Sequence, residues 1–199
     1  GLTPTTHIFK RRMGVVSHGI DMTDSVENEW LCLRLAAALG LPVNEARIES
    51  FEDQTVLIIT RFDRAPRDRG GILRLPQEDF LQALGFESGQ KYQEHGGPGM
   101  QDGLRLLEGS RERAANQLLF LKAQIVNWVL AAIDGHAKNF SLFVLPGGRY
   151  RMTPLYDVLS AWPLIGTGPN DLQYKKTKLA MAVRGKTAHY KMSEIQYRH

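Results

Sequence analysis

The sequence is nearly free of cysteine and contains no long uninterrupted apolar run. Its single cysteine, Cys32, excludes an internal disulfide and any zinc site built from several cysteines. The longest apolar stretch, Leu118 to Ile133, is interrupted by three polar side chains. Because a membrane-spanning helix needs roughly 20 mostly apolar residues, we expect no transmembrane segment and no membrane partner. The simplest interpretation is a cytoplasmic protein.

Several signatures of nucleotide-binding and hydrolytic enzymes are also absent from the sequence. There is no Walker A motif, no G-x-G-x-x-G fingerprint, no G-x-S-x-G elbow and no zinc-type cluster of His and Cys. The chain starts at Gly1 without Met or a signal-peptide pattern and stops abruptly at His199. We therefore expect a fragment of a longer protein.

What is present is the composition of an ordinary globular domain. The 199 residues are 43% hydrophobic and 23% charged, which excludes collagen-like and disordered chains and fits one domain or one two-lobed domain. The net charge of +4 is spread unevenly, because residues 173–199 hold seven Lys or Arg and one acidic residue, Glu194. That segment is either a solvated basic surface or one that attracts phosphates, nucleic acid or an acidic partner.

Hydrophobic patterns predict two parts of different character. Residues 1–63 are expected to form a small lobe of one strand, one helix and two further strands, and residues 64–199 a larger, mainly helical lobe with one β-hairpin. The expected strands are 5–10, 47–50, 55–62, 140–145 and 149–153, and the expected helices are 24–40, 77–85 and 111–133. This order predicts an α+β fold with two lobes, as in protein kinases.

Local features sharpen these expectations. Asp24 and Glu27 fit a capping box at the start of the first helix, and Gly40 fits its end. Residues 56–59 are apolar without alternation, which predicts a strand buried on both faces. The helix over 111–133 is apolar around most of its circumference in its second half, so we expect it to be buried at the centre of its lobe.

The most informative stretch runs from Asp134 to Asn139, between the expected long helix and the hairpin, and Asp157 follows that hairpin. Phosphoryl transfer needs one carboxylate that orients the attacking hydroxyl, and an amide oxygen and a second carboxylate that hold Mg²⁺ against the phosphates. The interval of five between Asp134 and Asn139 is that of the protein-kinase catalytic loop. A turn explains Asp134 better when it is taken alone, whereas the three residues in this order favour kinase chemistry.

Lys10 ends the first expected strand, as the phosphate-pairing lysine of a kinase ends a strand of the small lobe. Taken alone, it is more simply a surface lysine. Its ion-pair partner would be Glu27 or Glu29 in the next helix. Glu29 is favoured because it lies beside Trp30 on the apolar face, whereas the capping box already explains Glu27.

Thr60, Arg61 and Phe62 close the buried strand at the expected lobe boundary, where a two-lobed kinase presents backbone groups to the adenine. Phe62 is explained equally well by hinge packing and by stacking on adenine. His136 and Lys138 lie within the catalytic loop and within reach of phosphates. A single histidine is more simply structural, so Asp134 remains the expected base.

These residues resemble the HipA family, the serine/threonine kinase toxins of HipBA type II toxin–antitoxin systems. The resemblance covers nearly the whole chain and is carried by residues 1–8, 75–79, 91–92 with 96–99, 134–141, 153–157 with 160–161, and 178–181. It implies an ATP- and Mg²⁺-dependent kinase that phosphorylates a serine on a translation component, such as glutamyl-tRNA synthetase, and so inhibits growth and promotes persistence. It also implies a HipB-like helix-turn-helix antitoxin that neutralises the kinase and, in complex with it, binds operator DNA and represses the operon.

Carried over residue by residue, the resemblance implies that Asp134 is the catalytic base and that Asn139 and Asp157 bind Mg²⁺. It implies that the ATP contacts are Lys10, Thr60, Arg61, Phe62, His136, Ala137, Lys138, Asn139 and Asp157. Two departures matter. Thr60 stands where the family has a glutamate, and the phosphate-covering loop with its regulatory serine would lie upstream of Gly1, because Pro98 makes residues 96–99 an unsuitable phosphate cradle.

Two other functions are compatible with the same residues. A small-molecule kinase of related fold would use this catalytic loop on a low-molecular-weight hydroxyl. A non-catalytic corepressor subunit would act through the antitoxin alone, and it would have no need of Asp134, Asn139 and Asp157 together. The sequence therefore favours a protein kinase.

Overall fold

The computed structural model describes residues 4–68, 70–183 and 191–194. The strands are β1 (His7–Arg11), β2 (Gly14–Val15), β3 (Asp21–Met22), β4 (Ala46–Phe51), β5 (Gln54–Thr60), β6 (Arg64–Pro66), β7 (Ile72–Arg74), β8 (Gln77–Asp79), β9 (Ser141–Leu145) and β10 (Arg149–Met152). The α-helices are α1 (Ser25–Ala38), α2 (Phe80–Ala83), α3 (Met100–Leu106) and α4 (Arg113–Val129). Sheet dominates the first part and helix the second, which agrees with the predicted α+β fold.

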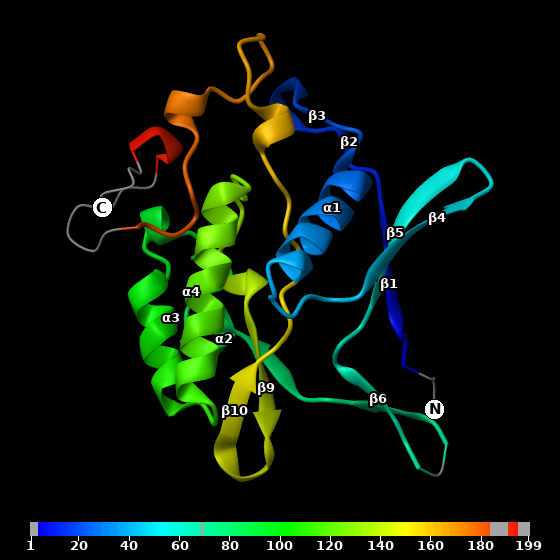
Figure 1. Ribbon diagram of the computed structural model, residues 1–199, viewed down its shortest axis with the longest axis vertical. Helices are drawn as coiled ribbons and strands as arrows, with labels where there is room; N and C mark the ends of the chain where they lie inside the picture. Colours follow the sequence, from blue (N-terminus) through cyan, green and yellow to red (C-terminus); the bar gives the residue numbers. More distant parts are fainter. Residues whose placement is uncertain (1–3, 69, 184–190, 195–199) are drawn as a thin grey trace.

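The first part is an antiparallel sheet in the order β1-β5-β4, with α1 packed beside it (Figure 1). Apolar residues of the central strand β5 meet the helix, and Val26, Leu57 and Ile59 form one buried cluster. Residues 56–59 are all buried, so the prediction of a strand covered on both faces is confirmed. The register pairs Lys10 with Leu57 and thereby places this lysine on the strand next to the buried centre of the sheet.

Helix α1 ends as predicted but starts differently. Gly40 has a φ of +79°, which favours glycine, and the N–H of Leu41 donates to the carbonyl of Ala36 across the helix end at 3.1 Å. At the start, the Asp24 side chain makes no capping hydrogen bond. Glu27 instead accepts a hydrogen bond from Arg12, so the predicted capping box is wrong.

The second part packs α2, α3 and α4 against a three-stranded antiparallel sheet in the order β10-β9-β8. The rings of Phe80, Phe120 and Phe140 meet at centroid distances of 5.0 to 5.7 Å in the core between these elements. The hairpin of β9 and β10 turns at residues 146–148, as predicted. The helix expected over 77–85 is wrong at its start, because residues 77–79 pair with β9 as β8 and only residues 80–83 are helical.

Helix α4 is shorter and less buried than the sequence predicts. It spans residues 113–129 rather than 111–133, and its buried face contains Phe120, Ala123 and Val126. Four large apolar side chains on other faces are 40% to 59% exposed, and these are Leu118, Leu121, Ile125 and Val129. The prediction of a helix buried at the centre of its lobe is therefore wrong for the outer face, because the apolar pattern includes a surface stripe as well as the core face.

The segment that follows β10 runs between α4 and α1 and joins the two parts (Figure 1). The Asn28 side chain of α1 exchanges two hydrogen bonds of 2.9 Å with the backbone of Ser160, while the Ser160 hydroxyl donates to the carbonyl of Leu130 at 2.6 Å. A buried asparagine with both amide groups paired fixes the relative position of helix and segment. Asp157 is located within this connecting segment.

Two further expectations concern the chain as a whole. Among the described residues, no helix has both the length and the apolar character that crossing a bilayer requires. The division into residues 1–63 and 64–199 stays a prediction, and the short hairpin of β6 and β7 follows the expected boundary.

We expect Phe120→Ala to destabilise the protein by about 3–5 kcal/mol, because Phe120 is fully buried and its removal leaves a cavity between Phe80 and Phe140. Urea unfolding of the complete protein would measure the change. The matched control is Phe9→Ala, since Phe9 is 61% exposed and touches only one other ring, that of Phe51, among the described aromatic pairs. A loss of the same size in both variants would contradict the assignment of Phe120 to the core.

Candidate active site

Lys10 is the centre of the polar cluster between the two parts. Its Nζ lies 2.8 Å and 2.9 Å from the two carboxylate oxygens of Glu29 and 2.6 Å from Oδ1 of Asp157. These three residues come from β1, α1 and the segment after β10. The choice of Glu29 over Glu27 as the partner of Lys10 agrees with this geometry, because Glu27 pairs with Arg12 instead.

The electrostatics of this cluster follow from burial and mutual attraction. Burial alone would lower the pKa of Lys10, but the carboxylates of Glu29 and Asp157 outweigh it and raise the pKa above its ordinary value. Burial raises the pKa of Glu29, and the Lys10 cation only partly offsets that rise. The Glu29 side chain is 4% exposed, so its charge depends on the lysine beside it.

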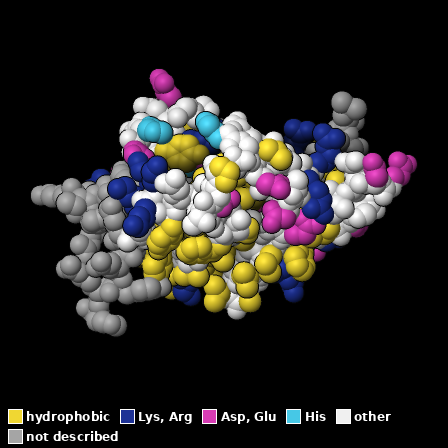
Figure 2. Space-filling view, turned by 90° about the horizontal axis from the view of Figure 1, so that it is seen from above, with side chains coloured by type: hydrophobic (Ala, Val, Ile, Leu, Met, Phe, Trp, Pro, Cys, Tyr) yellow, Lys and Arg dark blue, Asp and Glu magenta, His cyan; other side chains and the backbone are white. Residues whose placement is uncertain are grey.

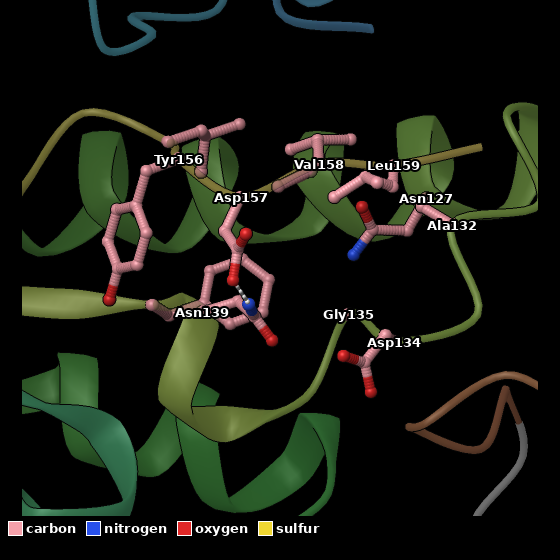
Figure 3. Close-up of a pocket in the computed structure, with 12 residues that line it drawn as sticks. Asn127, Ala132, Asp134, Gly135, Asn139, Tyr156, Asp157, Val158 and Leu159 are labelled. Atoms are coloured by element: carbon pink, nitrogen blue, oxygen red, sulfur yellow. Dashed lines mark hydrogen bonds between the residues drawn. The ribbon is translucent and has the colours of Figure 1, made fainter. Parts of the chain in front are cut away.

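Asp157 and Asn139 point toward one another (Figure 3). The Asn139 amide donates from Nδ2 to Oδ2 of Asp157 at 3.0 Å, so the two Asp157 oxygens are shared between Lys10 and Asn139. The backbone of Asp157 is in the left-handed region with φ +57°, which aspartate tolerates better than most residues. The strained backbone turns this carboxylate into the cluster, which is typical of functional sites.

The loop that carries Asp134 is fixed by the end of α4. Ala132 donates its N–H to the carbonyl of Asn127 at 2.7 Å, and a Cβ on Gly135 would lie 2.4 Å from the Asn127 amide nitrogen. Any larger residue at position 135 would force the buried Asn127 side chain to shift. A hydrogen bond within the loop also holds residues 134–139: the N–H of His136 donates to Oδ1 of Asn139 at 3.0 Å.

One hydrogen bond and two longer contacts surround Oδ1 of Asp134. The hydroxyl of Tyr92 donates a short hydrogen bond to it, Nε2 of His136 lies at 3.6 Å, and Nζ of Lys91 lies at 3.9 Å. The Asp134 side chain is still 62% exposed. A carboxylate held at one oxygen and open to the outside is suited to accept a hydrogen bond from an incoming hydroxyl.

His136 is a buried part of this arrangement rather than a free base. It is 5% exposed, and its ring packs edge-on against Tyr92 with centroids 5.3 Å apart. Burial lowers the pKa of His136, and Asp134 only partly opposes that shift, so the imidazole is neutral at pH 7. Its Nδ1 has no hydrogen-bond partner among the described residues.

A cavity of about 250 Å³ opens beside Lys10 and Asp157, and both residues form part of its wall. Arg61 and Phe62 line it, and the Phe62 ring contacts the rings of Tyr156 and Phe143 at 5.6 Å. Thr60, by contrast, is held within β5, where it pairs with His7 and donates its N–H to the carbonyl of Glu45 at 2.9 Å. The structure thus brings two of the three predicted hinge residues to this cavity.

The remaining predicted residues lie farther from the cluster centre. Ala137 is fully buried in the core of the second part, and Lys138 donates to the hydroxyl of Ser88 at 3.1 Å. In the basic segment, Lys178 pairs with Glu94. Residues 184–190 and 195–199 of this segment, and residues 1–3 of the first run that resembles the HipA family, lie outside the described residues.

Sequence reasoning assigned no role to Lys91 and Tyr92, although it included them among the runs of the resemblance. Both contact Asp134 from a loop more than forty positions earlier. Burial and the neighbouring Asp134 raise the pKa of Tyr92, so its hydroxyl remains a donor at neutral pH. Cys32, in contrast, is a plain buried thiol, and burial raises its pKa to about 11.

One lysine, one asparagine and two aspartates thus form the candidate site. Residues 1–198 match the family model described as the HipA-like C-terminal domain. The chain belongs to this HipA-like family. It is 40% identical over 158 residues to the putative kinase Y4mE of Sinorhizobium fredii, a match that covers 78% of this chain and 36% of the relative.

Other HipA relatives extend the comparison. The serine/threonine-protein kinase toxin HipA of Shewanella oneidensis is 33% identical over 153 residues, covering 68% of this chain and 34% of the toxin. A solved complex of Shewanella oneidensis HipA, HipB and operator DNA superposes with a TM-score of 0.78 and 27% identity, over 96% of this chain and 43% of that one. The proinflammatory kinase CtkA of Helicobacter pylori shares the fold, with a TM-score of 0.56, 16% identity and coverage of 76% of this chain and 50% of that one.

These comparisons confirm the HipA-type, kinase-like α+β fold. The chain spans about a third of the length of the two curated relatives. The activity, substrates and partners of the whole protein are therefore matters for proposal.

Replacing Lys10 by Met should lower the free energy of unfolding by about 1–3 kcal/mol at pH 7, because it leaves the buried Glu29 carboxylate without its cation. The loss should shrink as the pH falls, since the folded variant then binds a proton on Glu29 that the unfolded chain does not hold. Denaturant unfolding at several pH values would measure both effects.

The matched control is Arg12→Met, which breaks the parallel ion pair to Glu27 between the same strand end and helix. Both partners of that pair are more than 40% exposed, so a loss of about 1 kcal/mol or less is expected. If the two variants lost the same stability with the same pH dependence, Glu29 would not depend on Lys10.

Proposed function

We propose that this protein is an ATP-dependent serine/threonine protein kinase of the HipA type. The observation that carries the proposal is that Lys10 and Asn139 both contact the carboxylate of Asp157, while Asp134 lies on the adjoining loop. A phosphate-binding cation, a metal-binding pair and an exposed carboxylate are the parts that phosphoryl transfer requires. The names of the relatives as kinases support it.

The cavity lined by Lys10, Phe62 and Asp157 is the proposed nucleotide site. Phe62 and Tyr156 supply aromatic surface for the base, and the Lys10 ammonium supplies positive charge for the phosphates. The Lys10 ammonium can turn to a phosphate while Glu29 still holds it, because Glu29 contacts it through two oxygens.

Asp157 and Asn139 fit Mg²⁺, since this ion prefers carboxylate and amide oxygens and is bound by few protein ligands when phosphates complete its shell. An oxygen of Asp157 already attracts a cation, the Lys10 ammonium, at 2.6 Å. Bound Mg²⁺ would offset the negative charge of the phosphates. Asn139 would contribute its amide oxygen, which in this structure accepts from the His136 N–H.

In the proposed reaction, Asp134 accepts the proton of a serine or threonine hydroxyl. The hydroxyl oxygen forms a bond to the γ-phosphorus of ATP as the bond to the β–γ bridging oxygen breaks, and ADP leaves with the electron pair. Tyr92, Lys91 and His136 around Oδ1 orient the carboxylate so that its other oxygen faces the acceptor. Oδ1 of Asp134 then serves to position the carboxylate, and Oδ2 accepts the proton.

The biological role that we propose follows the HipA relatives. The Shewanella protein is named a toxin, and its solved complex contains HipB and operator DNA. We propose that the complete protein inhibits growth by phosphorylating a translation component such as glutamyl-tRNA synthetase. A HipB-like helix-turn-helix antitoxin would neutralise it, and the complex would repress its own operon.

Two substitutions separate the roles of the aspartates. Asp134→Asn should reduce phosphate transfer by about a thousandfold or more while Mg²⁺-ATP still binds, because it removes only the proton acceptor. Asp157→Asn should abolish transfer and also weaken Mg²⁺-ATP binding. Transfer is measured with labelled ATP and cell lysate, and binding by titration calorimetry, both on the complete protein.

The control is Asp53→Asn, at the exposed turn between β4 and β5, which should behave as the wild type. Full transfer activity in Asp134→Asn would overturn the assignment of the base. Transfer to a small hydroxyl compound with no labelled protein would replace the protein kinase by a small-molecule kinase.

A further inference from the structure

Three cavities follow one another across the site. The nucleotide cavity contains Lys10 and Asp157 in its wall, and a middle cavity of about 470 Å³ contains both of these and Asp134. A third cavity, of about 490 Å³, has Asp134 in its wall together with residues from the far side of the catalytic loop. Because in-line transfer places the acceptor opposite the leaving ADP, this third cavity lies where the acceptor must approach Asp134.

We call this third cavity the acceptor groove and define it by Ile20, Met22, Ile133, Leu164, Leu172 and Leu179. These residues come from the chain before α1, from the catalytic loop and from the segment after β10. Figure 2 views the molecule from above, where hydrophobic side chains reach the surface between groups of basic and acidic ones. Ile20, Met22, Leu164 and Leu172 are partly exposed, so the groove has an open, apolar wall.

The groove carries little charge for a polar ligand to use. Lys178 and Glu94 line it but pair with each other, and the free oxygen of Asp134 is the one that would meet the acceptor hydroxyl. The other polar side chains of its wall are those of Tyr92, His95 and Ser160. A sugar or a polycation would lose hydrogen bonds to water along the six apolar residues that define the groove and would regain few of them there. An apolar side chain, in contrast, gains from leaving water in a pocket of this size.

We propose that the acceptor groove binds a large apolar side chain, of the Leu, Ile, Met or Phe class, that stands close in sequence to the phosphorylated serine or threonine of a polypeptide. The inference rests on the proposed kinase function and specifies its substrate class. The inference is supported by the connection between the acceptor groove and the transfer site, because Asp134 belongs to both. A polypeptide whose hydroxyl contacts Asp134 must place its neighbouring residues along this wall.

The test uses the complete protein with a library of serine-containing peptides in which each flanking position is varied in turn. We expect selection of large apolar residues at one flanking position. Leu172→Glu should raise the KM for the best apolar peptide about tenfold or more and should move the selection at that position to Lys or Arg. The matched control, Leu73→Glu, changes an exposed leucine in β7 and should leave the selection as in the wild type.

A second measurement covers the case in which the kinase acts only on a folded target. Mass spectrometry of labelled lysate gives the phosphorylated site, and replacing its apolar neighbour by Asp should reduce phosphorylation about tenfold or more. Efficient transfer with no apolar preference at any flanking position, or an unchanged selection in Leu172→Glu, would contradict the proposed binding of an apolar side chain in the acceptor groove. Neither result would contradict the proposed kinase activity. Mg²⁺-ATP binding without transfer to any peptide or protein would overturn the proposed function and the groove with it.

Discussion

The ion-paired contact of Lys10 with Glu29 and Asp157 is the constraint on which the rest of the site depends. The Glu29 carboxylate is 4% exposed, and burying such a charge without a cation is costly. Because Lys10 comes from β1 and Glu29 from α1, the pairing fixes the helix against the sheet. Because Asp157 joins the same lysine, it also fixes the segment after β10 against both. The ion pairs of Lys10 therefore both stabilise the packing of β1, α1 and the segment after β10 and set the geometry of the site.

The loop of Asp134, which forms the second half of the site, is held in addition by contacts at the end of α4. Close approach of Gly135 to Asn127 holds the loop of Asp134, and the Asn139 amide then bridges from this loop to Asp157. The two halves meet through that hydrogen bond, through the connecting segment and through the packing of Cys32 and Leu33 against Ala132. A nucleotide bound between them would contact groups from both, which suits a kinase whose parts must close around ATP.

Much of the fold was predictable from the sequence because its signals are local. The strand over residues 56–59, the hairpin after Phe140 and the helix stop at Gly40 each depend on neighbouring residues, and each prediction is confirmed. The errors arose where distant residues compete. Arg12 takes the Glu27 carboxylate away from the helix start, and β9 draws residues 77–79 into a strand. Helix α3 was not predicted at all.

In the candidate site, too, local patterns were predictable and contacts between distant residues were not. The order of Asp134, Asn139 and Asp157 around the expected hairpin favoured kinase chemistry, and the resemblance to the HipA family added their roles and that of Lys10. The contacts of Lys91 and Tyr92 with Asp134 could not be predicted, because they join a loop to a residue more than forty positions away. The left-handed backbone of Asp157 is likewise a product of tertiary packing, since no glycine marks it in the sequence.

The proposed function requires that Lys10 link the buried Glu29 to a bound phosphate. The most direct test is a crystal structure of the complete protein with Mg²⁺ and a non-hydrolysable ATP analogue. We expect Lys10 to keep its contact with Glu29 and to exchange Asp157 for a phosphate oxygen, while Asp157 and Asn139 ligate the metal. An analogue bound away from Lys10, with the contact between Lys10 and Asp157 unchanged, would contradict it.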